Sequence, residues 1–130
     1  MIVDTSAIIA IALLEPEARR LTEAITMAGY VRMGAPNFLQ AALVIDNRAK
    51  PYVRARFDQY LHDADIDVVP FTAEMAVIAC DAHRTYGGGR HPAQLNLGDC
   101  FAYALARSLR QPLLFKGNDF SQTDIEAAPY

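Results

Sequence analysis

Short apolar stretches alternate with longer segments of helical periodicity along the whole 130-residue chain. The short stretches predict strands at residues 1–4, 30–33, 66–71 and 113–115. The longer segments predict helices over residues 6–14, 16–28, 37–49, 51–63, 73–85 and 99–109. This alternation is typical of an α/β protein whose mostly parallel sheet lies between helices. We therefore expect residues 1–130 to form a single α/β domain.

Residues that favour helix ends stand at the expected boundaries. Asp4 and Thr72 can accept hydrogen bonds from the first amides of the helices that follow them. Pro16 and Pro51 suit a first helical turn, where the missing amide hydrogen is not needed. Gly29 is placed to end the second predicted helix. These local signals agree with the division of the chain that the apolar pattern predicts.

The hydrophobic content of 52% is enough for a core and too high for a disordered chain. The longest apolar run, residues 7–14, is far shorter than the roughly 18 residues that a bilayer span needs. No Lys or Arg precedes that run, as a secretory signal would require. Cys80 and Cys100 lie in apolar helical patterns and are expected to be buried free thiols. We expect a cytoplasmic protein without a membrane contact.

The charge balance limits the partners. Lys and Arg number 12 against 15 Asp and Glu, which gives a net charge of −3. This balance excludes a general electrostatic attraction to nucleic acid, so any such contact has to use a local basic patch.

Three aspartates are expected at one edge of the sheet. Asp4 ends the first strand, Asp119 follows the last strand, and Asp99 begins the helix that leads to that strand. Because ligands of open parallel sheets bind at the carboxyl ends of the strands, the three carboxylates can converge there. Each of them alone also has an ordinary structural explanation as a helix cap or a turn residue. Only their shared location favours a common function.

Three ionised carboxylates repel one another strongly unless a cation neutralises them. Mg²⁺ or Mn²⁺ suits a cluster of carboxylate oxygens and also binds substrate phosphate. Such a metal generates hydroxide from a bound water and stabilises the charge that develops on phosphorus. The aspartates therefore point to hydrolysis of a phosphodiester.

Five segments carry a resemblance to a known family. The chain resembles the PIN-domain ribonuclease toxins of the VapC type, in order and over essentially its whole length. The segments are Met1-Ile-Val-Asp4-Thr-Ser-Ala, Ala35-Pro-Asn-Phe-Leu-Gln-Ala-Ala42, Tyr86-Gly-Gly-Gly-Arg-His-Pro-Ala93, Leu95-Asn-Leu-Gly-Asp99-Cys-Phe-Ala-Tyr-Ala-Leu-Ala106 and Pro112-Leu-Leu-Phe-Lys-Gly-Asn-Asp119-Phe, the last followed by Thr123-Asp-Ile. The Gly-Asp-Cys-Phe-Ala-Tyr-Ala part is the most specific.

The resemblance implies a PIN-like domain with a parallel sheet of four or five strands flanked by helices. It implies a homodimeric toxin that a cognate VapB-like antitoxin inactivates. Its activity would be Mg²⁺- or Mn²⁺-dependent endonucleolytic cleavage of tRNA, rRNA or mRNA. By position, Asp4, Asp99 and Asp119 match the family's metal-binding acids, and Ser6 (or Thr5) matches a hydroxyl that orients the site.

One position departs from the family pattern. A Glu on the third helix of the family falls at Gln40 in this chain. Asp46, six residues on, lies on another face of a helix and cannot replace it. Gln40 can still hydrogen-bond a metal-bound water but lacks the negative charge. Either the protein works with a weaker metal site, or this chain is an inactivated variant; the alternative function is a catalytically impaired PIN-like binding module.

The loop around the glycines at 87–89 is the place for a local basic patch. Arg84, Arg90 and His91, together with Lys116 at the sheet edge, could hold RNA phosphates. The alternative is an ordinary solvated loop. The glycines are not a phosphate-binding P-loop, because no Gly-Lys-Ser/Thr sequence follows them.

Two other functions of α/β domains lack a required acid. A phosphorelay receiver needs an acceptor Asp after the middle strand, and residues 68–72 contain none. A haloacid-dehalogenase-type phosphatase needs a second acid two residues after Asp4, where Ser6 stands. Apolar side chains of the first two helices, Leu13 and Leu14 among them, fill a core by default but could also form an antitoxin groove or a dimer contact.

Overall fold

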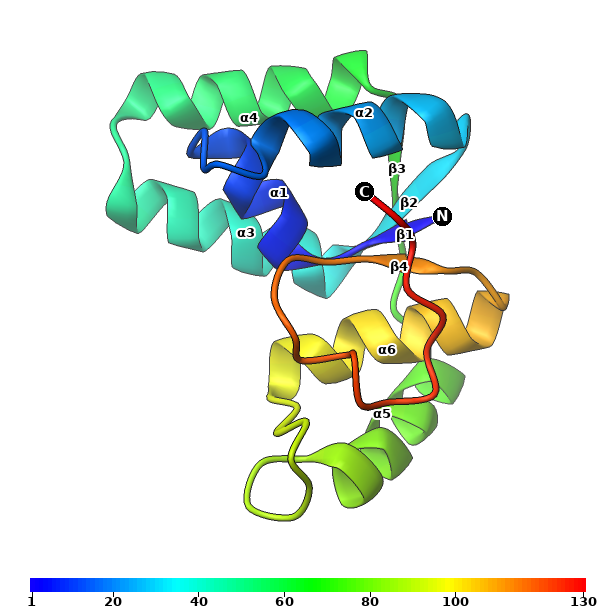
Figure 1. The fold of residues 1–130 in the computed structure, drawn as a ribbon. Coiled ribbons are helices and arrows are strands. Elements are labelled where there is room, and N and C mark those ends of the chain that lie inside the picture. The colour runs from blue at the N-terminus through cyan, green and yellow to red at the C-terminus, as the bar shows by residue number, and fades with distance from the viewer.

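Four short parallel strands pair in the order β3-β2-β1-β4 at the centre of the computed structural model, which describes all 130 residues (Figure 1). The strands are β1 (Ile2–Val3), β2 (Val31–Gly34), β3 (Ile66–Val69) and β4 (Leu113–Leu114). The helices are α1 (Thr5–Ala12), α2 (Ala18–Ala28), α3 (Ala35–Arg48), α4 (Pro51–Asp63), α5 (Ala73–Tyr86) and α6 (Leu97–Leu109). The predicted α/β fold is confirmed, with four strands in the sheet.

The helices cover both faces of the sheet. Helices α1 to α4 lie on one face, and α5 and α6 lie on the other (Figure 1). Successive strand residues point to opposite faces, so Val3 joins the core under α1 to α4 and Ile2 joins the core under α6. Leu114 and Leu113 divide between the two cores in the same way. The central strands are therefore buried on both sides.

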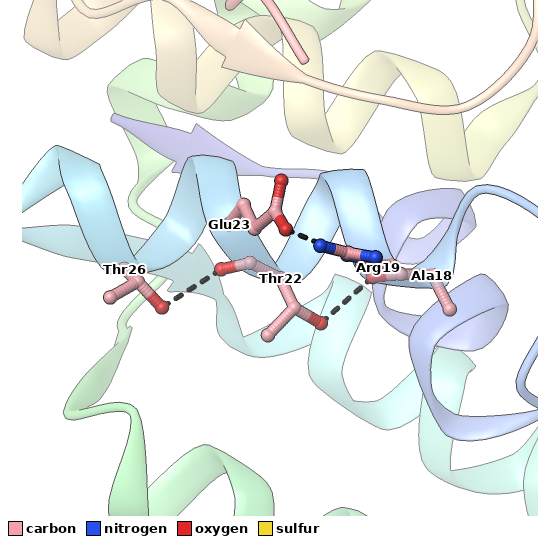
Figure 2. Close-up of polar contacts among 5 residues, drawn as sticks. All are labelled: Ala18, Arg19, Thr22, Glu23 and Thr26. Carbon is pink, nitrogen blue, oxygen red and sulfur yellow. Dashed lines mark hydrogen bonds and ion pairs between the residues drawn. The ribbon is translucent and has the colours of Figure 1, made fainter.

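Helix α2 packs on the sheet side that α1 to α4 cover, with one apolar face inward and one polar face exposed to solvent. It buries Leu21 and Ile25, while Arg19 and Glu23 form an exposed ion pair at 2.9 Å (Figure 2). Two threonine hydroxyls on the same helix donate to carbonyls one turn earlier, Thr22 to Ala18 and Thr26 to Thr22. Because an exposed ion pair contributes only about 0.3–0.5 kcal/mol, the apolar stripe is what holds α2 in place.

Several expectations differ from the structure. Helix α1 ends at Ala12 rather than at residue 14, α3 begins at Ala35 rather than at residue 37, and α6 begins at Leu97 rather than at residue 99. Helix α2 begins at Ala18 rather than at Pro16, because residues 16 and 17 form a turn in which the amide of Ala18 donates to the carbonyl of Glu15 at 2.9 Å. Strand β3 stops at Val69, two residues early. Cys100 is buried as expected, but Cys80 is exposed, because α5 packs against α6 and leaves one of its apolar sides uncovered. No helix combines the length and the apolar character that crossing a membrane requires.

Candidate active site

The order in which the strands are added to the sheet reverses at β1. From β1 the chain continues to β2 and then β3 on one side, and it returns to β4 on the other side. In open parallel sheets the space beyond such a reversal, at the carboxyl ends of the strands, is where ligands bind. Asp4 directly follows β1 at this rim, and its amide donates to the carbonyl of Leu114 at 2.9 Å.

Asp4 is buried and firmly oriented. It is the N-cap of α1, and its Oδ2 accepts hydrogen bonds from the amide of Ser6 at 2.9 Å and the hydroxyl of Ser6 at 2.5 Å. The same hydroxyl oxygen accepts a bond from the amide of Lys116 at 3.0 Å. Ser6 therefore connects Asp4 to the segment that leaves β4 and leads to Asp119.

Asp99 is the second buried acid of this rim. It lies in the first turn of α6 and forms a reciprocal capping box with Asn96, because each side chain accepts a hydrogen bond from the other residue's amide at 2.9 Å. The cap explains locally why a helix begins here. It also holds the carboxylate of Asp99 at the helix start.

The pKa values show that the three aspartates affect one another. Burial raises the pKa of Asp4, and the negative charge of Asp119 adds to the effect. Burial also raises the pKa of Asp99 to about 6, with further contributions from the charges of Asp4 and Asp119. Asp119 itself is exposed. Two buried carboxylates and one exposed carboxylate therefore repel one another at one rim.

The nearby lysine does not neutralise these acids. The ammonium of Lys116 pairs with the carboxylates of Glu15 and Glu17, which lie between α1 and α2. The hydrogen bond to Glu15 is the main reason why the pKa of Lys116 is raised. The charge of Lys116 is thus compensated by glutamates, and the repulsion among the aspartates remains.

Gln40 lies between the first turns of α1 and α6. Its Oε1 is 3.0 Å from the hydroxyl oxygen of Thr5, and its amide lies against Gly98, the residue before Asp99. A β-carbon on residue 98 would come within 2.6 Å of Gln40 Nε2, so glycine makes this approach possible. Asp46 does point elsewhere, as predicted, because it pairs with Arg54 of α4 at 2.6 Å.

The donor set fits a hard divalent cation. Asp4, Asp99 and Asp119 offer carboxylate oxygens, and burial together with mutual repulsion leaves them in need of positive charge. No three acidic, histidine or cysteine side chains are gathered closely enough to hold a metal ion as they stand. The carboxylate oxygens are of the type that Mg²⁺ or Mn²⁺ prefers, but the three aspartates would have to move closer together to share one ion, so the metal-ligand assignment stays a prediction.

Comparison with known proteins agrees with this arrangement. The sequence profile of the PIN domain family matches residues 1–126. The chain belongs to the PIN domain family. It is 45% identical to Ribonuclease VapC42 of Mycobacterium tuberculosis over 98% of both chains. It is 48% identical to Ribonuclease VapC30 of the same organism, over 96% of this chain and 95% of the relative.

Solved structures show the same fold. The crystal structure of Mycobacterium tuberculosis VapC20, described as a sarcin-ricin loop cleaving toxin, aligns with a TM-score of 0.77 and covers 98% of both chains at 15% identity. A toxin-antitoxin complex from Klebsiella pneumoniae aligns with a TM-score of 0.73 and 16% identity, over 99% of this chain and 97% of that one. At these identities the likeness concerns the PIN fold alone.

The basic residues of this PIN domain do not form one cluster. Arg84 and Arg90 line a cleft of about 660 Å³ between α5 and α6, where Arg84 also pairs with Asp81 at 2.8 Å. His91 accepts a hydrogen bond from the amide of Ala93 at 3.1 Å. Lys116 pairs with glutamates instead of extending this group. The role of these four side chains toward RNA stays a prediction.

Sequence reasoning missed one residue of the site. Asn37 of α3 is 1% exposed, and its amide donates to Thr5 and to the carbonyl of Gly98 at 3.1 Å each. The sequence shows only that a polar residue lies one helical turn before Gln40. A solvent-exposed asparagine would give the same pattern, so the sequence does not identify Asn37 as a buried residue of the site.

Proposed function

We propose that this PIN domain is the toxin of a VapBC-type toxin–antitoxin pair and an endoribonuclease that depends on Mg²⁺ or Mn²⁺. The observation that supports the proposal is that Asp4 and Asp99 are both buried and that their neighbours Thr5 and Gly98 are bridged by one side chain, Asn37, at the reversal point of the sheet. Relatives at 42–48% identity that are named VapC ribonucleases support an enzyme over a PIN-like module that only binds.

The side chains of the rim have distinct roles in this proposal. Asp4, Asp99 and Asp119 would hold the divalent cation, which would activate a water and stabilise the charge on the scissile phosphate. Ser6 orients Asp4 through the 2.5 Å hydrogen bond from its hydroxyl. Gln40 offers an amide to a water or a phosphate oxygen. These five residues form the proposed catalytic site.

Phosphates that flank the cleaved bond need cations outside the metal site. Arg84, Arg90 and His91 surround the end of α5 and the loop that follows it, which makes them the proposed contacts to RNA. Lys116 contributes only when a phosphate displaces Glu15 or Glu17 from its ammonium group. The substrate class is tRNA, rRNA or mRNA, and the reaction takes place in the cytoplasm.

A groove of about 230 Å³ between α1, α2 and α4 offers a site for the cognate VapB-like antitoxin. It is lined mainly by apolar side chains, and Leu14 at its edge is 70% exposed. An apolar helix face of the antitoxin would cover this groove. Leu39 and Leu43 of α3, both exposed, belong to a separate surface on which a second copy would form the homodimer.

A metal titration of RNA cleavage tests the proposal. The purified chain is incubated with total tRNA and rRNA in EDTA and then in increasing Mg²⁺ or Mn²⁺. We expect endonucleolytic products that need the metal and that disappear in Asp4→Asn. Cleavage that persists in Asp4→Asn would indicate a contaminating nuclease. An absence of cleavage at every metal concentration, with intact binding of an antitoxin, would favour the binding module instead.

A further inference from the structure

One buried amide joins the three helices of the candidate site. Asn37 of α3 donates through Nδ2 to the hydroxyl of Thr5 in α1 and to the carbonyl oxygen of Gly98 in α6, each at 3.1 Å. The hydroxyl of Thr5 lies 3.2 Å from the carbonyl oxygen of Asn37, which can accept its proton. A single side chain therefore bridges α1 and α6 from within α3.

The two bridged residues are the direct neighbours of the two buried acids. Thr5 follows Asp4, and Gly98 precedes Asp99. Asp4 and Asp99 repel each other when both are ionised, and the nearby ammonium of Lys116 pairs with Glu15 and Glu17 instead of with them. The hydrogen bonds of Asn37 act directly beside the two acids, where they oppose this repulsion and add to the strand pairing and packing that hold α1 and α6 in place.

The amide remains buried although part of it is unpartnered. Asn37 Oδ1 is shielded from solvent and has no hydrogen-bond partner. It lies against Gly34, where a β-carbon would be 3.3 Å away. A buried polar atom without a partner is destabilising, and an apolar side chain of similar size would avoid it. The two hydrogen bonds that Nδ2 donates compensate for the cost of burying the unpartnered Oδ1.

We propose that Asn37 is a positioning residue that sets the separation of Asp4 and Asp99 and thereby the affinity of the rim for a divalent cation. This inference rests on the proposed function. Asn37 itself does not touch the cation or the RNA. It acts on the first turns of α1 and α6, through Thr5 and through the carbonyl of Gly98. Residues that orient metal ligands in this way commonly change metal affinity or activity by about 10- to 100-fold when they are replaced.

The test compares Asn37→Ala with Asn47→Ala. Asn47 lies on the same helix but is exposed, so the matched substitution leaves the rim untouched. Mn²⁺ binding is measured by electron paramagnetic resonance, and hydrogen exchange is followed at the amides of Ser6 and Asp99. For Asn37→Ala we expect Mn²⁺ binding weaker by about 10- to 100-fold, faster exchange at both amides, and a reduced kcat for RNA cleavage with KM unchanged. Asn47→Ala should match the parent chain in every measurement.

Parent-like Mn²⁺ affinity in Asn37→Ala would overturn the proposal, whether or not exchange changes. A parent chain that neither cleaves RNA nor binds Mn²⁺ would refute the proposed function instead. Exchange at Ser6 and Asp99 would then still decide whether Asn37 positions the two helix starts. If Asn37→Ala does not unfold cooperatively, Asn37→Leu repeats the test, because leucine fills a similar volume but cannot form the two hydrogen bonds of the amide.

Discussion

The side-chain amide of Gln40 occupies the space that a β-carbon on Gly98 would need, with Nε2 only 2.6 Å from that position. Gly98→Ala therefore has to displace the side chain of residue 40 from the rim. The displaced group is the flexible end of a side chain, and alanine is favoured over glycine in a helix by up to about 1 kcal/mol. We expect the free energy of unfolding to change by no more than about 1 kcal/mol while RNA cleavage falls by at least about tenfold. Urea unfolding and a cleavage assay on the same preparation measure both.

Gln40→Glu is expected to raise both Mg²⁺ affinity and the rate of RNA cleavage. The substitution keeps the shape of the side chain and places a negative charge next to the hydroxyl of Thr5, which can donate to it. Calorimetric titration with Mg²⁺ and a cleavage time course give the two quantities. Asn47→Asp, which adds the same charge to an exposed position of α3, should change neither. Unchanged affinity and rate in Gln40→Glu would remove position 40 from the catalytic site.

The two substitutions can be combined. If Gly98→Ala acts by displacing residue 40, it should cancel the gain that Gln40→Glu produces alone. A double variant that cleaves RNA as fast as Gln40→Glu would show that the approach of residue 40 to Gly98 does not matter for activity.

Stability without metal should fall as the pH rises from about 4 to about 6. Asp99 has a pKa of about 6 in the folded chain against its ordinary value of 3.8, so in this window the folded state binds more protons than the unfolded state. The difference corresponds to at most about 3 kcal/mol lost by neutral pH, because screening by solvent reduces the effect, and burial of Asp4 acts in the same direction. Urea unfolding in EDTA at pH 4.5 and pH 7.5 measures the loss.

Asp99→Asn should reduce this pH dependence, because it removes a buried charge and can keep the cap with Asn96. We therefore expect the variant to be more stable than the parent chain at pH 7.5, although it is inactive. Asp67→Asn on β3, an exposed position, serves as the control. Equal pH dependence in Asp99→Asn and the parent would mean that Asp99 does not carry the effect.

Arg90→Glu is expected to weaken RNA binding and to lower its salt dependence. A cation that contacts a phosphate contributes close to one unit to the slope of the logarithm of the RNA-binding constant against the logarithm of the salt concentration. Replacing Arg90 by a negatively charged residue removes that contribution. Fluorescence anisotropy with labelled RNA at several salt concentrations gives the slope. Arg19→Glu on the outer face of α2 is the control for the change in net charge. A slope equal to that of the parent chain would exclude Arg90 from the RNA contact.

Elements with local end signals could be predicted well from the sequence. Helix α4 begins at Pro51, and α5 begins after Thr72, whose hydroxyl accepts from the amide of Met75 at 3.2 Å. That Asp4 and Asp99 would share one rim could also be predicted, because the carboxyl ends of parallel strands and the starts of the following helices lie together.

Features that depend on long-range partners could not be predicted. The sequence makes Lys116 a candidate contact to phosphate, but its ammonium pairs with Glu15 and Glu17, which lie about a hundred residues earlier in the chain. Cys80 lies on an apolar helix face, and the pattern does not show which part of that face another helix covers. Asn37 is one polar residue in a helix, and only the tertiary structure shows that its amide meets Thr5 and Gly98.

The position of β1 between β2 and β4 has a consequence for synthesis. The ribosome makes β1 first and β4 last of the four strands, and Asp119 emerges later still. A growing polypeptide thus contains Asp4 long before the strand beside it exists. If cleavage needs Asp119, as the proposed function requires, a growing chain cannot cut RNA before this residue has been added.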